Sequence, residues 1–322
     1  MARIPVPSTA ALTILPDPPG PPTPIGLIAG GGQLPIAIAR GLREIGHPVH
    51  GLGLSRQYSR DLPRMCSSFH EVALLRIGSW ARILRNQGVR HAIMVGNVDK
   101  AKLMHDPWRA LRNIPDFRTA VAWYRHIRHD RRSHAVLAAI AEELDKEGVS
   151  LLDSTFPIPD QIASAGVMTQ KRPTPAQMAD IEFVWPILSD MLRLDIGQSI
   201  AVRDRDVIAV EAVEGTDRMI ERVGRLCKAR GWVLCKGARV GHDRRSDVPT
   251  VGVRTIEHMY ANGGRCLAVA VGNVIMLERE KMIDAADRLG VSIIGVSVSI
   301  EGPKTAGAVI REAKPLVSSA AR

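Results

Sequence analysis

The stretch Ile25-Gly-Leu-Ile-Ala-Gly-Gly-Gly-Gln-Leu-Pro35 decides the fold class of this 322-residue chain. Residues 25–29 predict a buried strand, the three glycines predict a tight turn, and Leu34 begins a predicted helix that ends at Gly46. The alternation continues with a strand at 49–54, a helix near 80–87 and a strand at 92–95. Because strands that alternate with helices build parallel sheets, the sequence predicts a Rossmann-like N-terminal domain.

A second α/β domain of mixed sheet is predicted beyond residue 160. A helix over 175–192 precedes a hairpin at 199–203 and 207–211, and Thr216 is the predicted cap of the next helix. Further strands are expected at 233–236, 266–271, 274–277 and 292–298, with helices at 253–261 and 279–289. The expected organisation is a disordered Pro-rich extension (1–24), the Rossmann-like domain (25–152), a linker (153–160), the second domain (161–300) and a loose tail (301–322).

Composition narrows the class of partner. Forty-three Lys and Arg against 33 Asp and Glu give a net charge of +10, which favours anionic partners such as nucleotides or acidic lipid surfaces. With 4% aromatic residues and no zinc-finger spacing, nucleic acid is not an expected partner. No apolar run approaches the roughly 18 residues of a membrane-spanning helix. The four cysteines are scattered, which predicts free thiols in the reducing cytoplasm.

Two turns at predicted strand ends are candidates for ligand contact. Gly30, Gly31 and Gly32 would let backbone N–H groups approach a phosphate at a helix start, although a plain tight turn explains them as well. The full Gly-x-Gly-x-x-Gly spacing of dinucleotide sites is absent, and no acidic residue ends the following strand. Asn97, in Gly96-Asn97-Val98, either contacts a ligand or forms an ordinary Asn turn.

Polar residues crowd the segment from Lys236 to Gly252. Its carboxylates and guanidinium groups suit metal-bridged phosphate chemistry, and a solvated turn with ion pairs is the alternative. Upstream, Glu211, Glu214 and Asp217 surround a predicted helix start, where they either satisfy free N–H groups or help to order a hydrated Mg²⁺. Asp195 and Gln198 allow either turn hydrogen bonds or ligand contact.

These segments occur in one order, and together they resemble the LpxI-type UDP-2,3-diacylglucosamine pyrophosphatases of lipid A biosynthesis from about Ile25 to about Val298. The family pattern Arg-x-Asp-Leu-Pro-Thr-Ile-Gly is matched by Arg245, Asp247, Pro249, Thr250 and Gly252. Two departures exist. The family's Lys-Ala-Pro-Lys-Pro is Lys236-Gly-Ala-Arg-Val here, and Arg131 replaces an acidic residue beside Asp130.

The resemblance implies Mg²⁺-dependent hydrolysis of UDP-2,3-diacylglucosamine to 2,3-diacylglucosamine 1-phosphate (lipid X) and UMP. It implies that Asp247 is the catalytic residue, as metal ligand or general base, and that Asp247, Asp217 and Glu214 hold the metal. The implied substrate-binding residues are Ala29, Gly30, Gly31, Gly32, Leu34, Pro35, Asn97, Gln198, Lys236, Arg245 and Thr250.

The resemblance also implies a ligand cleft between the domains, with the acyl chains in it, and a cytoplasmic enzyme that touches the inner membrane transiently. The Arg-rich segment 125–132 would attract anionic headgroups or form a solvated basic face. A homodimer is the oligomer we would expect if one forms. Two other classes stay open: a nucleotide- or nicotinamide-dependent oxidoreductase, and a noncatalytic lipid or nucleotide sensor.

Overall fold

The computed structural model describes residues 15–55, 57–98, 116, 119, 124, 133–239, 243–245 and 248–297. Backbone proximity divides the chain into two compact units. Unit 1 runs to Pro159 and includes the described residues 243–245, and unit 2 begins at Asp160 and resumes at Val248. The chain therefore returns to unit 1 for a few residues in the middle of unit 2.

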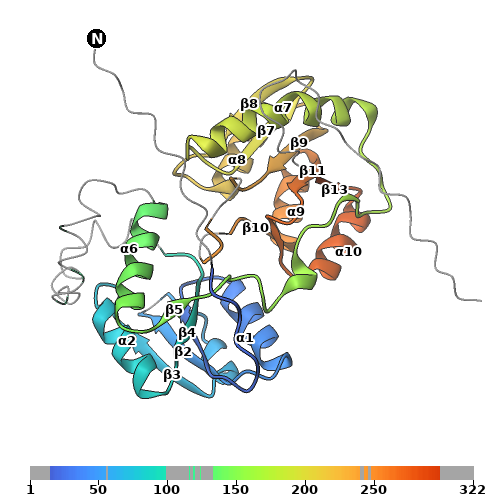
Figure 1. Cartoon of the computed structure of the whole chain (residues 1–322). Helices are drawn as coiled ribbons and strands as arrows, with labels where there is room; N and C mark the ends of the chain where they lie inside the picture. The colour runs from blue at the N-terminus through green and yellow to red at the C-terminus, as the bar shows by residue number, and fades with distance from the viewer. Residues whose placement is uncertain are drawn as a thin grey trace, which may run out of the picture. The chain divides into compact units, whose positions relative to one another are not determined.

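Unit 1 is built on a five-stranded parallel sheet with the order β3-β2-β1-β4-β5 (Figure 1). The first strand, β1, leads into helix α1, whose first turn contains Pro35, and both β1 and the inner face of α1 are buried. A residue without a backbone N–H is well tolerated in the first turn of a helix. The elements are β1 (Ile25–Ala29), α1 (Leu34–Glu44), β2 (Val49–Leu54), η1 (Leu62–Met65), β3 (Ser68–Val72), α2 (Ile77–Asn86), β4 (His91–Val95), α6 (Ser133–Lys146) and β5 (Ser150–Leu151).

Unit 2 is built on a six-stranded mixed sheet with the order β6-β13-β11-β9-β7-β8. The strands β9, β11 and β13 run parallel, and β6, β7 and β8 are antiparallel to their neighbours. The elements are η3 (Pro159–Gln161), β6 (Gly166–Val167), α7 (Pro175–Arg193), β7 (Ser199–Arg203), β8 (Asp206–Val210), α8 (Thr216–Leu226), β9 (Trp232–Lys236), β10 (Thr250–Val251), α9 (Val253–Ala261), β11 (Gly264–Ala270), β12 (Ile275–Met276), α10 (Arg279–Leu289) and β13 (Ser292–Val296).

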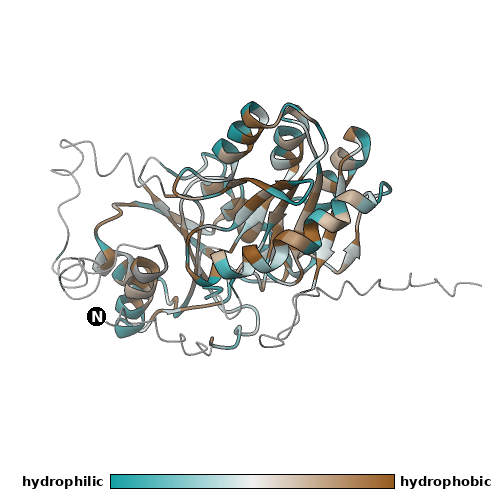
Figure 2. Ribbon diagram, turned by 90° about the horizontal axis from the view of Figure 1, so that it is seen from above, coloured by the Kyte–Doolittle hydropathy of each residue, from teal (hydrophilic) through white to brown (hydrophobic). Residues whose placement is uncertain are grey.

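Each unit has its own hydrophobic core, because each sheet buries its strands under helices. In unit 2, α7 packs on β7 and β9, and its N-terminus is closed by a capping box between Thr174 and Gln177. Pro186 lies inside this helix, which nevertheless continues to Arg193. Figure 2 shows helices that alternate between hydrophilic and hydrophobic residues, as helices with one buried face must.

The architecture confirms the predicted fold class of two α/β domains, the first a parallel Rossmann-like sheet and the second a mixed sheet. One residue departs from its predicted role. Helix α8 is capped by Gly215, not by Thr216, which is instead its first helical residue. The expected linker packs into unit 1, where Ser154, Thr155 and Ile158 are buried.

The expected N-terminal extension is described only from residue 15 onward. Its last residues contact unit 1, since Nδ1 of His47 lies 2.8 Å from the carbonyl oxygen of Thr23. The expected tail at 301–322 and the Arg-rich segment 125–132 lie outside the described residues. In the described part of the chain, no helix has the length and apolar character needed to cross a bilayer.

Candidate functional site

The two predicted ligand turns of unit 1 meet at the point where the strand order reverses. Strands β1 and β4 are neighbours, and the turns that follow them are joined by an antiparallel bridge between Gly31 and Asn97. The amide of Gly31 donates to the carbonyl oxygen of Asn97 at 2.8 Å, and the amide of Asn97 donates back at 2.9 Å. Open α/β sheets bind ligands outside the carboxyl ends of their strands at such a switch point.

Close backbone approach explains the glycines. A Cβ added to Gly30 would lie 2.6 Å from the carbonyl oxygen of Asn97, and one added to Gly96 would lie 2.8 Å from the backbone of Gly30. The amides of Gly30 and Gly31 are consumed by bonds to Val95 and Asn97, so they do not face a phosphate. These two amides are therefore not available to a phosphate, and a phosphate contact at this turn would use the backbone amides that follow them.

The start of α1 is where amide donors remain in this turn. Helix α1 has no side-chain cap, Pro35 carries no N–H, and the amide of Ile36 bonds to the carbonyl of Gln33. Helix geometry then leaves the amides of Gln33 and Leu34 directed out of the helix N-terminus. Asn97 is exposed beside them and can reach a ligand, whereas Ala29 and Pro35 are buried and shape the turn.

In unit 2, Lys236 lies at the carboxyl end of β9 in a buried polar network. Its Nζ donates to Thr216 Oγ1 at 2.7 Å and to Ser199 Oγ at 3.2 Å, and it lies 3.6 Å from Glu211 Oε2. Thr216 in turn donates to Glu211 Oε1 at 2.9 Å. Lys236 is 3% exposed and Glu211 is 8% exposed, so the ammonium that was predicted to bind substrate is directed toward protein acceptors.

The two predicted metal ligands of unit 2, Glu214 and Asp217, have different partners. Glu214 accepts hydrogen bonds from Arg222 Nη2 at 2.5 Å and from the amide of Ala212 at 3.2 Å. Asp217 is exposed on α8, 3.7 Å from His258 and 3.9 Å from Arg254. Glu214 therefore has Arg222 as its arginine neighbour, and Asp217 has Arg254.

Within the polar segment from Lys236 to Gly252, Arg244 contacts residues 153–155 of unit 1. Its Nε lies 3.0 Å from Asp153 Oδ2, its Nη2 donates to Thr155 Oγ1, and its carbonyl oxygen accepts from the amide of Ser154 at 2.8 Å. Two of these residues, Ser154 and Thr155, are buried, and the hydroxyl of Thr155 donates to Asp153 Oδ1 at 2.6 Å. Contacts with residues 153–155 thus fix the position of Arg244.

Arg245, a predicted substrate ligand, is paired with Asp243. Its Nε and Nη2 donate to the two carboxylate oxygens at 2.9 and 2.6 Å, and these bonds raise the pKa of the Arg245 guanidinium above its ordinary value. Thr250 donates its hydroxyl to the carbonyl oxygen of Val248 at 3.1 Å. Gln198 joins β9 through its carbonyl oxygen, which accepts from the amide of Gly237 at 3.0 Å. Asp247, the predicted catalytic residue, lies outside the described residues.

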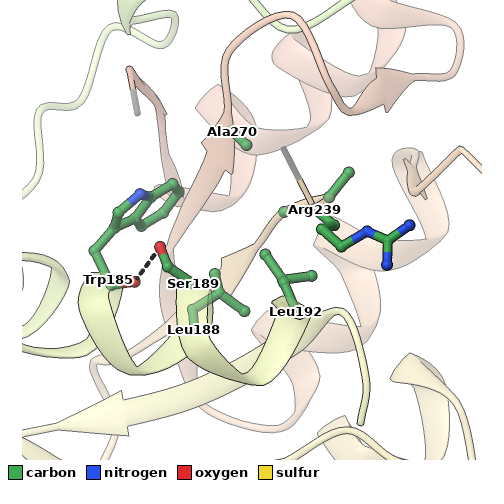
Figure 3. Close-up of a pocket in the computed structure, with 8 residues that line it drawn as sticks. Trp185, Leu188, Ser189, Leu192, Arg239 and Ala270 are labelled. Atoms are coloured by element: carbon green, nitrogen blue, oxygen red, sulfur yellow. Dashed lines mark hydrogen bonds between the residues drawn. The ribbon is translucent and has the colours of Figure 1, made fainter. Parts of the chain in front are cut away.

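An apolar pocket lies beside this end of β9 in unit 2. Trp185, Leu188, Ser189 and Leu192 of α7 line it, together with Gly237, Ala238, Arg239 and Ala270 (Figure 3). Sequence reasoning missed this pocket, and it also missed Ser199 as a partner of Lys236. Both depend on α7 and β7 lying against β9, which no local sequence signal encodes.

A metal cluster is not formed by the described residues: they contain no group of three or more His, Cys, Asp and Glu side chains placed to hold an ion.

Comparison with known proteins identifies the family. The family model of the LpxI N-terminal domain matches residues 24–161, and that of the LpxI C-terminal domain matches residues 164–294. A protein of Caulobacter vibrioides named UDP-2,3-diacylglucosamine pyrophosphatase LpxI is 31% identical over 282 residues, which cover 84% of this chain and 97% of that protein. The chain belongs to the LpxI family. The resemblance expected from the ordered motifs is thereby confirmed.

Among solved structures, a match to an N-terminal ketoreductase from a macrolactin assembly line has 9% sequence identity and a TM-score of 0.23. It covers 87% of this chain and 55% of the ketoreductase chain. Similarity at this level carries no information about the function of the LpxI family member described here.

Proposed function

We propose that this protein hydrolyses the pyrophosphate bond of UDP-2,3-diacylglucosamine to 2,3-diacylglucosamine 1-phosphate and UMP in lipid A biosynthesis. The observation that carries the proposal is the 31% identity to a protein named for this activity, over 97% of that protein's length. The same observation favours a hydrolase over the oxidoreductase and sensor alternatives. In the reaction one water is consumed, its oxygen joins one phosphorus, and the bridging oxygen leaves with the other.

Several residues of the chain support this chemistry. The uncapped start of α1 and the side-chain amide of the exposed Asn97 offer donors to a phosphate, since helix N-termini stabilise anions. Asp247 is proposed to orient or deprotonate the attacking water, because removing a proton from water in the transition state needs a positioned base. Arg245 is proposed to contribute positive charge near the phosphates while Asp243 fixes its orientation.

Mg²⁺ dependence is part of the proposal. The ion would be held by Asp247 together with the substrate's phosphates, and when bound it would neutralise charge on the diphosphate. Glu214 and Asp217 are the weaker part of the ligand set that the family resemblance implied, because Glu214 is bonded to Arg222 and Asp217 lies 3.9 Å from Arg254.

The decisive experiment supplies purified protein with UDP-2,3-diacylglucosamine and Mg²⁺ and measures UMP by chromatography. We expect UMP release that excess chelator stops and that added Mg²⁺ restores. UDP-glucose, which has the same diphosphate without acyl chains, is the matched control and should be hydrolysed far more slowly. Binding of the lipid without UMP release would favour a sensor, and nicotinamide absorbance in the purified protein would favour an oxidoreductase.

We also propose transient contact with a membrane surface, since the substrate is a lipid and the net charge is +10. Leu194, Ile196 and Val213 are exposed, and the loop at Gly197 packs against the backbone of Glu211, so these apolar side chains project from adjacent loops. Sedimentation with anionic vesicles tests this contact, and Val213→Ser should weaken it. A homodimer stays a prediction that light scattering in the same buffer would decide.

A further inference from the structure

The segment that Arg244 contacts, residues 153–155, follows strand β5 at the carboxyl edge of the parallel sheet. Strand β5 pairs with β4 and β4 pairs with β1, and the three strands run parallel. The carboxyl ends of adjacent parallel strands share one edge, so this segment lies at the same edge as the turn where Gly31 meets Asn97. Arg244 is therefore held at the edge of unit 1 that carries the candidate phosphate donors.

The segment that receives Arg244 is a rigid support. Thr155 is buried, and it donates from its amide and from its hydroxyl to Asp153 Oδ1 at 2.8 and 2.6 Å. Further along the chain, the carbonyl group of Pro157 packs so closely on Gly41 of α1 that a Cβ at Gly41 would overlap it. The first carboxylate oxygen of Asp153 is thus engaged within the segment, and the second lies 3.0 Å from Arg244 Nε.

Three contacts join Arg244 to this support. Besides the ion pair with Asp153, its Nη2 donates to Thr155 Oγ1 and its carbonyl oxygen accepts from the amide of Ser154 at 2.8 Å. Thr155 lies 89 positions before Arg244, so these contacts are tertiary. The described residues between the end of β9 and the start of β10 belong to no helix or strand, so tertiary contacts must fix this part of the chain.

Arg245 is the residue whose place depends on these contacts. Its guanidinium pairs with Asp243, which orients the side chain within the turn, whereas the contacts of Arg244 place the turn itself. A shift of about 1 Å in a group that stabilises the transition state can cost roughly 10²-fold in rate. The side chains of Arg244 and Asp153 are 34% and 26% exposed, and ion pairs this open to solvent contribute little to stability.

We propose that Arg244 is a positioning residue: by binding Asp153 and Thr155, it places Arg245 at the carboxyl edge of the parallel sheet. The inference rests on the proposed function, in which Arg245 contributes positive charge near the phosphates. It adds a residue that the family pattern did not assign, because the matched pattern begins at Arg245.

Arg244→Met removes the guanidinium and keeps an unbranched side chain. We expect kcat for UDP-2,3-diacylglucosamine to fall roughly tenfold to hundredfold, with KM changed less than about threefold. The melting temperature should stay within about 2 °C of wild type, since the ion pair is partly exposed. Arg244→Lys restores a charge for Asp153 without the forked donors, so its kcat should be intermediate. A kcat within about twofold of wild type in Arg244→Met would overturn the proposal.

Asp153→Asn tests the same contact from the other side. Its amide oxygen can keep the bonds from Thr155, while its nitrogen replaces the oxygen that faces Arg244. We expect kcat to fall as in Arg244→Met, and the double variant to be no slower than the slower single variant, because the two groups act as one. Multiplicative losses in the double variant would overturn the proposal. The matched control, Glu147→Gln, removes the carboxylate that pairs with Arg85 in the same unit and should leave kcat unchanged.

Limited digestion of the full-length protein with trypsin reports on the contact without turnover. Asp153→Asn keeps both arginines of the turn, so cleavage after Arg245 can be compared directly with wild type by mass spectrometry. We expect this cleavage to be at least about fivefold faster, because a released turn opens more often to the protease. Glu147→Gln should match wild type.

Equal cleavage of Asp153→Asn and wild type would overturn the proposal, and this result also decides the case in which Arg244→Met fails to fold. If wild-type protein released no UMP, the proposed function would fail, and faster cleavage of Asp153→Asn would still show that residues 153–155 hold the turn.

Discussion

Replacing Lys236 by Met should destabilise unit 2 strongly, because it removes the cation from a buried ion pair. Lys236 and Glu211 are 3% and 8% exposed, and the ammonium lies 3.6 Å from Glu211 Oε2. Oε2 is a buried oxygen without a hydrogen-bond partner among the described residues, whereas Oε1 accepts a bond from Thr216. The ammonium is therefore the group that compensates the charge on Glu211.

The magnitude follows from the cost of an uncompensated buried charge. Removing one partner of a buried pair costs roughly 3–5 kcal/mol, and the surviving bond from Thr216 to Glu211 places the expectation at about 3 kcal/mol. With an m value of about 2 kcal/mol/M, the urea midpoint of unit 2 should fall by about 1.5 M. Hydrogen exchange of the β9 amides, followed by mass spectrometry, assigns the loss to this unit.

The double variant Lys236→Met/Glu211→Gln is the control. It removes both charges, so it should recover at least half of the lost stability. A loss below about 1 kcal/mol in Lys236→Met, or no recovery in the double variant, would refute the ion-pair argument. Turnover separates the two roles of Lys236: if it also binds substrate, the double variant will be stable but will keep a raised KM.

The remaining predictions concern the loop, the glycine turn and the thiols. Asp247→Ala should lower the single-turnover rate by at least roughly 10²-fold with a smaller change in substrate dissociation constant, and Asp243→Ala should be milder; a fully active Asp247→Ala protein would remove Asp247 from the chemistry. Gly30→Ala should lower the melting temperature, because its methyl would lie 2.6 Å from the carbonyl oxygen of Asn97, and an unchanged melting curve would contradict this close packing. Maleimide near neutral pH should label Cys227 first, because burial raises the pKa of the three other thiols; rapid labelling of four thiols would show that the cores open.

Strong local signals made much of the fold predictable. The strands β1 and β2 and the helices α9 and α10 begin and end at the predicted residues, because each combines an apolar pattern with a glycine or polar boundary. The meeting of Gly31 with Asn97 follows from the same pattern, since turns after adjacent parallel strands share one edge of the sheet.

Elements with weak patterns were missed. Strand β3, Ser-Phe-His-Glu-Val, lies at the edge of its sheet and buries only Val72, so it lacks the apolar run that marks a buried strand. Strands β5, β6 and β10 have two residues each, too few for any periodicity to show. The prediction that Thr216 caps α8 was wrong because Gly215, with a positive φ of 80°, occupies the cap and frees the Thr216 hydroxyl for Glu211 and Lys236.

A sequence motif does not show which side chains its charged residues pair with in the folded protein, so it cannot assign their roles alone. The sequence places Lys236, Glu214 and Asp217 near candidate phosphate sites, but it contains no information about which neighbours neutralise them. In the structure Ser199 faces Lys236 because β7 runs antiparallel to β9, and the cation beside Glu214 is Arg222, two turns along α8. A carboxylate that already accepts an arginine and a backbone amide has less to offer a hydrated Mg²⁺. Loss of Glu214 should therefore weaken the start of α8 more than it weakens metal dependence, and the metal requirement of the proposed reaction then falls on Asp247 and the substrate's own phosphates.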